Sequence, residues 1–310
     1  PNLHVFFGNY GTGALNKSNF RGAVDVSAKI ISLNGSTFHG IARLTYDGGG
    51  SHPTYNGLGG NTFMQDAYLT MINSTNGSFV TATSAPDTFK GDVYVVNEAN
   101  SGGIYLSHVA KGNVFEKNVY LKTSQASISI GSGGGTSTLP TGAKIEPLGG
   151  NGLTGGGVLL WGLDMTEPLD LNIANTRVNL GGVTNRNHFK SDVNLIADAV
   201  SINGNTFDQS ATITYAGNIT HYNTFSAGSN IFNGPATLNL TGSGTFLMSR
   251  TYKDVFKNTL TVESGSAGVI HLAHNDKEAN EYHSDVSLTT DGGFITMSSY
   301  QNALDFSFAH

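Results

Sequence analysis

The chain has 310 residues, enough for one or two globular domains, but charged residues make up only 12% of it, about half the usual share. The net charge of −6 excludes the basic surface that nucleic acids and anionic membranes attract. No apolar run approaches the length of a membrane span, so we expect a soluble segment without membrane insertion. The absence of cysteine excludes disulfides and thiolate metal sites. Because 38% of the residues are hydrophobic, a folded core is favoured over disorder.

The first feature along the chain is a phenylalanine that recurs in an uneven rhythm, one short interval followed by three longer and nearly equal ones. A short polar residue stands two positions before each one, and a corner containing Gly or Asn follows most of them. A period of roughly 20–50 residues predicts an array of stacked supersecondary units. The series comprises Phe20, Phe38, Phe63, Phe89 and Phe115, preceded by Ser18, Ser36, Asn61, Asp87 and Asn113.

One period shows how many strands a unit contains. Between Phe89 and Phe115 lie two short alternating apolar runs, Val93–Val96 and Ile104–Leu106, which are typical of strands. The segment around the phenylalanine supplies a third strand, and no window has the apolar spacing of a helix. Three strands in about 25 residues predict the coil of a parallel β-helix. The rival interpretation is a pair of immunoglobulin-like sandwiches, which would not require this period.

The phenylalanine is then missing between Phe115 and Phe189, a stretch that corresponds to about three periods. Alternating runs persist there at Ser127–Ile130, Val158–Trp161 and Asp170–Ile173. A linker between two domains is the rival interpretation of this stretch. The strand-like runs favour continued stacking of coils.

A second series has the same uneven rhythm, again with a short interval followed by longer ones. Most of it lies about 169 residues after the first series, which makes the larger unit itself a tandem repeat. The segment Val24–Gly48 aligns without gaps with Val193–Gly217. We therefore predict two tandem solenoid units, residues 1–169 and 170–310, the second of them truncated, in one continuous rod. The second series comprises Phe189, Phe207, Phe232 and Phe256, preceded by Asn187, Asn205, Asn230 and Asp254.

The repeat pattern runs into both ends of the sequence. Pro1 begins inside the pattern, and His310 follows Phe306 where another unit would start. We therefore expect a piece of a longer repetitive polypeptide. His283 stands where the match to Phe115 predicts a phenylalanine, which indicates a weaker rung or a shift of register.

The predicted coil gives the recurring residues a structural role. Inward side chains would stack on identical ones in neighbouring coils, so that the phenylalanines form a ladder. Each buried Phe contributes roughly 1.5–3 kcal/mol, and offset stacking adds about 0.5–1.5 kcal/mol. The Asn or Asp at the preceding corner is expected to bond neighbouring backbone and to tolerate left-handed angles.

Several short motifs recur in a fixed order: Ser32–Phe38, Asn61–Phe63, Asp87–Asp92, Asn205–Phe207 and Ile270–Asn275. In these motifs the chain resembles the repeat regions of giant secreted surface proteins of Bacteroidota, which are commonly exported by the type IX secretion route. The resemblance covers essentially the whole chain, apart from the poorly matched stretch 140–168. It implies an adhesin, a gliding-associated surface fibre or a filamentous appendage that is secreted and attached to the cell surface.

Parallel β-helices also occur in polysaccharide lyases and glycoside hydrolases, whose sites need clustered carboxylates. Acidic residues are sparse here, and the tandem copy replaces Asp25 by Asn194 and Asp92 by Thr259. His271 and His274 would point to opposite faces of one strand, which argues against their chelating one metal ion. Core packing is the expected role of the single Trp161. The densest ionisable cluster comprises His271, His274, Asp276, Lys277, Glu278, Glu281 and His283.

We therefore predict an all-β parallel β-solenoid that serves as a non-catalytic structural or adhesive segment of a large extracellular filament or adhesin. Its expected partners are other copies of itself, other cell surfaces and glycans, with no nucleic acid. No catalytic residue, metal site or cofactor is predicted. The alternative function is a carbohydrate-active β-helix enzyme.

Overall fold

The computed structural model describes residues 4–8, 17–48, 57–73, 77–108, 112–131, 135–149, 155–218, 226–265, 267–273 and 279–297. The described residues form 33 β-strands and no helix. They belong to two compact units, Pro1–Asp164 and Met165–His310. Within each unit the strands pair in parallel with strands one coil away along the chain, so the protein is a parallel β-solenoid, as the sequence predicted. The tandem units 1–169 and 170–310 stay a prediction from the sequence repeat.

The strands of the first unit are β1 (His4–Gly8), β2 (Ser18–Phe20), β3 (Val24–Ala28), β4 (Ile30–Asn34), β5 (Ser36–Phe38), β6 (Ala42–Tyr46), β7 (Thr62–Phe63), β8 (Ala67–Met71), β9 (Ser78–Val80), β10 (Thr88–Phe89), β11 (Val93–Asn97), β12 (Gly103–Leu106), β13 (Val114–Phe115), β14 (Val119–Thr123), β15 (Ser127–Ile130), β16 (Ser137–Leu139), β17 (Ile145–Pro147) and β18 (Gly157–Leu160). Strand β19 (Leu163–Met165) has residues on both sides of the unit boundary. The predicted runs Val93–Val96 and Ile104–Leu106 are confirmed as β11 and β12.

The strands of the second unit are β20 (Leu169–Leu180), β21 (His188–Phe189), β22 (Val193–Ile202), β23 (Thr206–Phe207), β24 (Ala211–Tyr215), β25 (Ile231–Phe232), β26 (Ala236–Leu240), β27 (Thr245–Leu247), β28 (Val255–Phe256), β29 (Leu260–Gly265), β30 (Val269–His271), β31 (Glu281–Tyr282), β32 (Val286–Asp291) and β33 (Phe294–Thr296). Strands β20 and β22 are long, and a register shift between Ile173 and Arg177 interrupts their pairing.

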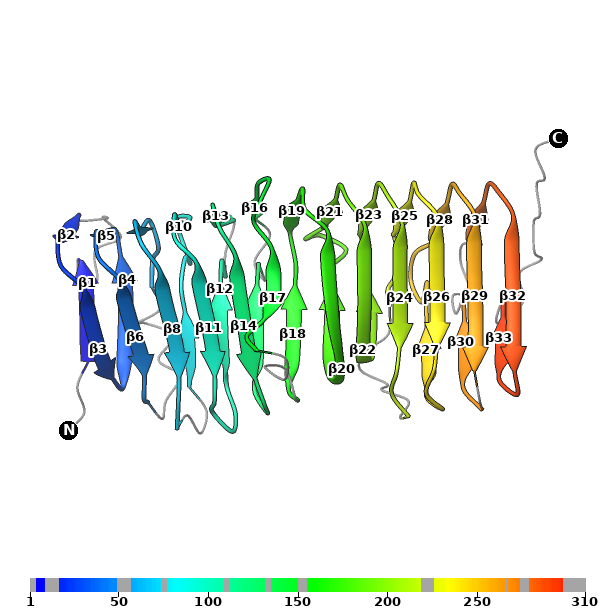
Figure 1. The fold of residues 1–310 in the computed structure, drawn as a ribbon, viewed down its shortest axis with the longest axis horizontal. Helices are drawn as coiled ribbons and strands as arrows, with labels where there is room; N and C mark the ends of the chain where they lie inside the picture. Colours follow the sequence, from blue (N-terminus) through cyan, green and yellow to red (C-terminus); the bar gives the residue numbers. More distant parts are fainter. Residues whose placement is uncertain are drawn as a thin grey trace. The chain divides into compact units, whose positions relative to one another are not determined.

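Each unit stacks its coils in chain order, so that three kinds of strand form three sheets (Figure 1). In the first unit the strands on the phenylalanine side follow the order β2-β5-β7-β10-β13-β16, the strands that come next along each coil β3-β6-β8-β11-β14-β17, and the third strands β9-β12-β15-β18. In the second unit the corresponding orders are β21-β23-β25-β28-β31, β20-β22-β24-β26-β29-β32 and β27-β30-β33. Because a solenoid aligns residues one coil apart, each sequence position becomes a column along its sheet.

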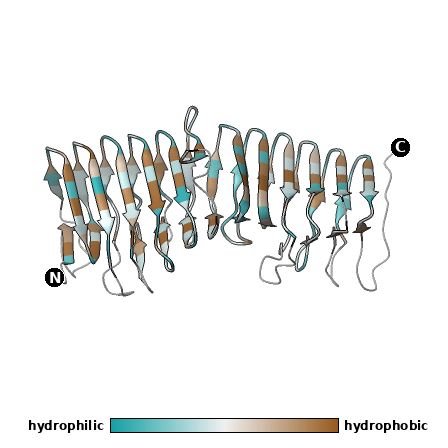
Figure 2. Ribbon diagram, turned by 60° about the horizontal axis from the view of Figure 1, so that its bottom comes forward, coloured by the Kyte–Doolittle hydropathy of each residue, from teal (hydrophilic) through white to brown (hydrophobic). Residues whose placement is uncertain are grey.

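Side chains alternate between the interior and the outside along each strand. In β11, Val93 and Val95 are completely buried, whereas Tyr94 and Val96 are partly exposed. Figure 2 shows the same alternation as hydrophobic and hydrophilic bands along the strands. Every coil therefore has inner columns that make the core and outer columns that face the surroundings.

The phenylalanine ladder is confirmed in both units. Successive rings stack with centroids 4.7–5.4 Å apart and with interplanar angles of 4–15°. In the last described coil the rung is Tyr282, which stacks on Phe256 at 5.4 Å, and His283 lies one position further on. The shift of register is therefore the correct reading of His283.

The stretch between Phe115 and Phe189 continues the solenoid in each unit, so the linker interpretation is wrong. In the first unit β15 pairs with β18, and the pairing of Val114 with Thr138 sets Leu139 opposite Phe115. In the second unit β20 pairs with β22, and the Lys190 amide donates to the Met165 carbonyl. Leu139 and Met165 are buried where other coils have phenylalanine.

The polar residues two positions before the phenylalanines form an interior polar column. Most of the side-chain oxygens accept the backbone N–H of the residue one coil earlier, as in Ser36 N–H to Asn61 Oδ1 at 2.9 Å and Asn205 N–H to Asn230 Oδ1 at 3.0 Å. The predicted bonding to backbone is found, but the bonded backbone belongs to the adjacent coil rather than to the same corner. The expected left-handed angle is not found on these residues; a positive φ occurs at their predecessors instead, such as Gly204 at 62° and Ser229 at 67°. The described members of this column are Ser36, Asn61, Asp87, Asn113, Ser137, Asn187, Asn205, Asn230, Asp254 and Asn280.

Candidate contact surface

Three tyrosines form an outer column on neighbouring coils of the first unit. Tyr68, Tyr94 and Tyr120 are in register on β8, β11 and β14, and each is half-buried. Their rings stack with centroids 4.4 and 5.0 Å apart and interplanar angles of 4° and 16°. Since the rings cover one another's faces, the column presents ring edges and hydroxyl groups. We call Tyr68, Tyr94 and Tyr120 the tyrosine column.

Charged side chains stand at both ends of this column. Arg43 on β6 is in register with Tyr68, and its guanidinium carbon lies 4.8 Å from the ring centroid. Such a cation–π contact contributes about 0.5–1 kcal/mol at an exposed site. Glu146 on β17 is in register with Tyr120 at the other end. The stacking and the cation–π contact thus hold side chains in a regular arrangement on the outer surface, where core packing does not require it.

A row of polar corner residues borders the tyrosine column. Asp66 Oδ1 accepts the Asp92 N–H at 3.0 Å, and Asp92 Oδ1 accepts the Asn118 N–H at 3.1 Å. Asn118 also donates through Nδ2 to the Tyr120 hydroxyl at 3.0 Å. These bonds hold the corners at the same spacing as the rings.

The phenol of Tyr94 is a neutral hydrogen-bonding group. Burial raises the pKa of Tyr94 to about 12, and the neighbouring Tyr68, Asp92 and Asp66 add to the shift by repulsion. A neutral phenol both donates and accepts, and a carboxylate accepts. The tyrosine column and its corner row therefore suit a ligand that carries many hydroxyl groups, such as a polysaccharide.

The tyrosine column was not predicted from the sequence, although its signal is present there. Tyr68, Tyr94 and Tyr120 each stand at the same place after a ladder phenylalanine. Trp161, for which core packing was expected, is half-buried rather than fully buried, and its indole nitrogen is buried without a hydrogen-bond partner.

Asp25 and Asp92, which were noted in the sequence, and the further acids Asp47 and Asp66 lie on different parts of the coil. Asp25 is exposed on β3, in register with Arg43. Asp47 follows β6, and its Oδ1 accepts from Asn73 Nδ2 at 3.0 Å. Only Asp66 and Asp92 are brought together, at successive corners.

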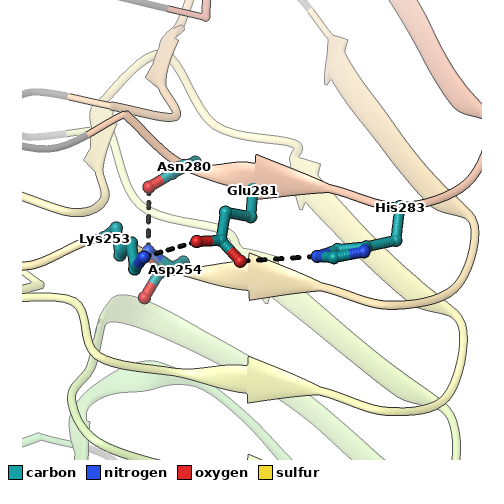
Figure 3. Close-up of polar contacts among 5 residues, drawn as sticks. All are labelled: Lys253, Asp254, Asn280, Glu281 and His283. Atoms are coloured by element: carbon teal, nitrogen blue, oxygen red, sulfur yellow. Dashed lines mark hydrogen bonds and ion pairs between the residues drawn. The ribbon is translucent and has the colours of Figure 1, made fainter. Parts of the chain in front are cut away.

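The predicted ionisable cluster is only partly within the described residues, since His274, Asp276, Lys277 and Glu278 lie outside them. Glu281 pairs with Lys253, a residue that the sequence analysis missed, and His283 Nε2 lies 3.4 Å from Glu281 Oε2 (Figure 3). His271 instead shares a hydrogen bond with the Thr296 hydroxyl at 2.6 Å. Within the described ranges, no group of three or more His, Asp or Glu side chains could hold a metal ion.

An open depression of about 360 Å³ lies at the ends of β26, β29 and β32 in the second unit. Two carboxyl groups line it, those of Glu263 and Asp291, together with Asn239. The Asn239 side-chain oxygen is buried and has no hydrogen-bond partner. Carboxyl groups beside a depression are the arrangement on which a carbohydrate-active enzyme would depend.

Comparisons of the chain with protein-family models, curated proteins and solved structures gave no match. In the part of the chain that the structure describes, no helix is long and apolar enough to cross a membrane. The function is therefore inferred from the fold, from the tyrosine column and from the depression at the ends of β26, β29 and β32.

Proposed function

We propose that the protein is a non-catalytic structural and adhesive segment of a large extracellular cell-surface filament or adhesin, and that it attaches cells to glycans or to other surfaces. The tyrosine column is the observation that carries this proposal. Its side chains lie outside the core, yet their rings stack in a regular row, and the Tyr120 hydroxyl accepts a hydrogen bond from Asn118. Exposed side chains that are held in a regular arrangement can serve to bind a ligand.

The coil architecture supports the structural part of the proposal. Side chains of the same kind stack on each other through each unit, so every coil reinforces its neighbours. The motif resemblance supports the extracellular location and export by the type IX route. Self-association into a filament is part of the same proposal.

The test of the adhesive part is binding of the purified protein to immobilised polysaccharides and to cell surfaces. The triple variant Tyr68→Thr, Tyr94→Thr, Tyr120→Thr should bind at least tenfold more weakly and remain folded. The matched control is Thr237→Ala with Thr261→Ala in the second unit, at the places equivalent to Tyr68 and Tyr94, and it should bind normally. Equal binding by the wild type and the tyrosine variant would contradict the proposal.

The carbohydrate-active enzyme is the second candidate, favoured by the depression that Glu263 and Asp291 line. Glycoside hydrolysis uses a pair of carboxyl groups, one of which acts as an acid. Incubation with a panel of polysaccharides tests this candidate. Depolymerisation that is lost in Glu263→Gln or Asp291→Asn, and kept in the triple tyrosine variant, would establish the enzyme in place of the adhesive segment.

A further inference from the structure

Two members of the interior polar column are carboxylic acids. Asp87 and Asp254 are 0% exposed, and each stands two positions before a ladder phenylalanine in its own unit. Asp87 lies between Asn61 and Asn113. Asp254 lies between Asn230 and Asn280 in the second unit. The two acids occupy equivalent places in a column of amides and hydroxyls.

Each carboxyl group receives hydrogen bonds through Oδ1 from the coil before it. Asp87 Oδ1 accepts from the Asn61 backbone N–H at 2.9 Å and from Asn61 Nδ2 at 2.8 Å. Asp254 Oδ1 accepts from the Asn230 N–H at 2.8 Å and from Asn230 Nδ2 at 2.9 Å. Asparagine would accept the same bonds at either place.

The second carboxylate oxygens differ between the two acids. Asp254 Oδ2 accepts from the Ser249 hydroxyl at 2.6 Å. Asp87 Oδ2 is buried and accepts no hydrogen bond of normal geometry, although the Thr81 hydroxyl is close enough to influence it. A buried charge without full compensation is costly, so both sites favour a neutral carboxyl group.

Few charged groups face these two acids. The groups that influence the pKa of Asp87 are the polar side chains of Asn61 and Thr81. Beside Asp254, Lys253 pairs with Glu281, which His283 also approaches (Figure 3). Burial raises the pKa of the Tyr282 hydroxyl to about 12, and the Asp254 charge adds to this shift by repulsion.

Protonation gives each of these two acids a hydrogen-bond donor, as the asparagines of the interior polar column have in their side-chain amides. Asn205 donates through Nδ2 to Asn230 Oδ1 at 2.9 Å and to the Leu180 carbonyl at 3.1 Å. A protonated carboxyl group has an O–H that can donate in the same direction, whereas the carboxylate only accepts. The neutral acid therefore fits the column as asparagine does.

We propose that Asp87 and Asp254 are proton-binding sites in the interior of the two units, and that each unit becomes more stable when the medium is acidified. This device goes beyond the proposed adhesive function and does not depend on it. It would make the segment most rigid in mildly acidic surroundings.

The direction follows from linkage between protonation and folding. Burial raises the pKa of both carboxyl groups to about 6, above the ordinary value of 3.8. The folded state therefore binds protons more tightly than the unfolded state, and stability rises as the pH falls through 6 toward 4. Between pH 7.5 and pH 5 the folded-to-unfolded ratio should rise about tenfold for each carboxyl group.

The first test is a carbon-13 NMR titration of the aspartate side chains in the whole protein. Asp87 and Asp254, assigned from the single variants Asp87→Asn and Asp254→Asn, should titrate near pH 6. Titration of both below pH 4.5 would overturn the proposal.

The second test is native-state hydrogen exchange of the Asn61 and Asn230 amides, which donate to the two carboxyl groups. After correction for the intrinsic exchange rate, their opening should be about tenfold rarer at pH 5 than at pH 7.5. Asp87→Asn should remove this pH dependence at Asn61 and leave it at Asn230, and Asp254→Asn should do the reverse. The exposed control Asp192→Asn should change neither amide. Unchanged pH dependence in the interior variants, or their failure to fold at pH 7.5, would overturn the proposal.

Discussion

The outer faces of the two units differ although their interiors match. In the first unit the outer column is Arg43, Tyr68, Tyr94 and Tyr120, and in the second unit the equivalent places hold Thr212, Thr237, Thr261 and Ser287. The inner columns retain phenylalanine and the polar residue before it in both units, including a buried aspartate in each.

This difference distinguishes the inner residues, which the coil requires for its packing, from the outer residues, which can vary. An inner residue stacks on its equivalents above and below, so one substitution disturbs three coils. An outer residue faces solvent and can change at little cost. A regular column of large aromatic side chains outside the core therefore indicates a function that the second unit's threonine column does not share.

Removing a ladder ring should have the largest effect, and the effect should be equal in the two units. Phe89→Ala and Phe232→Ala each delete a fully buried ring stacked on both sides. We expect each to lower the free energy of unfolding by about 3–5 kcal/mol, because a cavity remains. Denaturant unfolding measures the change. Tyr94→Ala in the outer column is the control and should cost less than half as much; equal losses would end the distinction between inner and outer columns.

The buried acids should distinguish the two units more finely. At pH 7.5 we expect Asp87→Asn to raise the free energy of unfolding by roughly 2–3 kcal/mol, since it removes a buried charge. Asp254→Asn should raise it by about 1 kcal/mol less, because the Ser249 hydrogen bond already compensates part of that charge. Denaturant unfolding at pH 7.5, pH 5 and pH 3.5 measures both. The gain should fall by about 1.4 kcal/mol between pH 7.5 and pH 5 and nearly vanish below pH 4, where the carboxyl group of the unfolded chain is also protonated. A larger gain for Asp254→Asn would contradict the assigned roles of the second oxygens.

Transfer of the outer column tests whether it suffices for binding. The variant Thr212→Arg, Thr237→Tyr, Thr261→Tyr, Ser287→Tyr builds the first unit's outer column on the second unit. In a protein whose own tyrosine column is replaced by threonine, we expect it to restore at least tenfold in affinity, about 1.4 kcal/mol. Binding to immobilised polysaccharide measures the gain. No recovery by a folded variant would show that the corner row of Asp66 and Asp92 is also required.

The exposed ion pairs of the second unit should matter least. Lys253 and Glu281 are each 42% exposed, so their pairing is screened by solvent. Glu281→Gln should change the free energy of unfolding by less than about 1 kcal/mol, and the change should shrink as salt is added. Thermal unfolding at low and high ionic strength checks this. In the first unit the equivalent places hold Pro86, Val114 and Glu116, and the unit folds without the pair.

The sequence by itself determined the coil. A solenoid brings residues one period apart into contact, so the spacing of Phe63, Phe89 and Phe115 already specified which rings would stack. The type of the polar residue before each ring predicted a bond to backbone, whereas its reach to the adjacent coil was seen only in the structure.

Some contacts depend on the length of a coil or on whether a side chain points into the interior or to the outside, and these were decided only by the tertiary structure. The length of the coil that follows Phe256 sets Tyr282 rather than His283 on the ladder. The partnership of Lys253 with Glu281, the cation–π contact of Arg43 and the complete burial of Asp87 and Asp254 follow from which face each side chain takes. The sequence period determines which residues are neighbours along a column, whereas the packing of the coil determines which columns are shielded from water. The raised pKa of a buried carboxyl group is a consequence of that shielding.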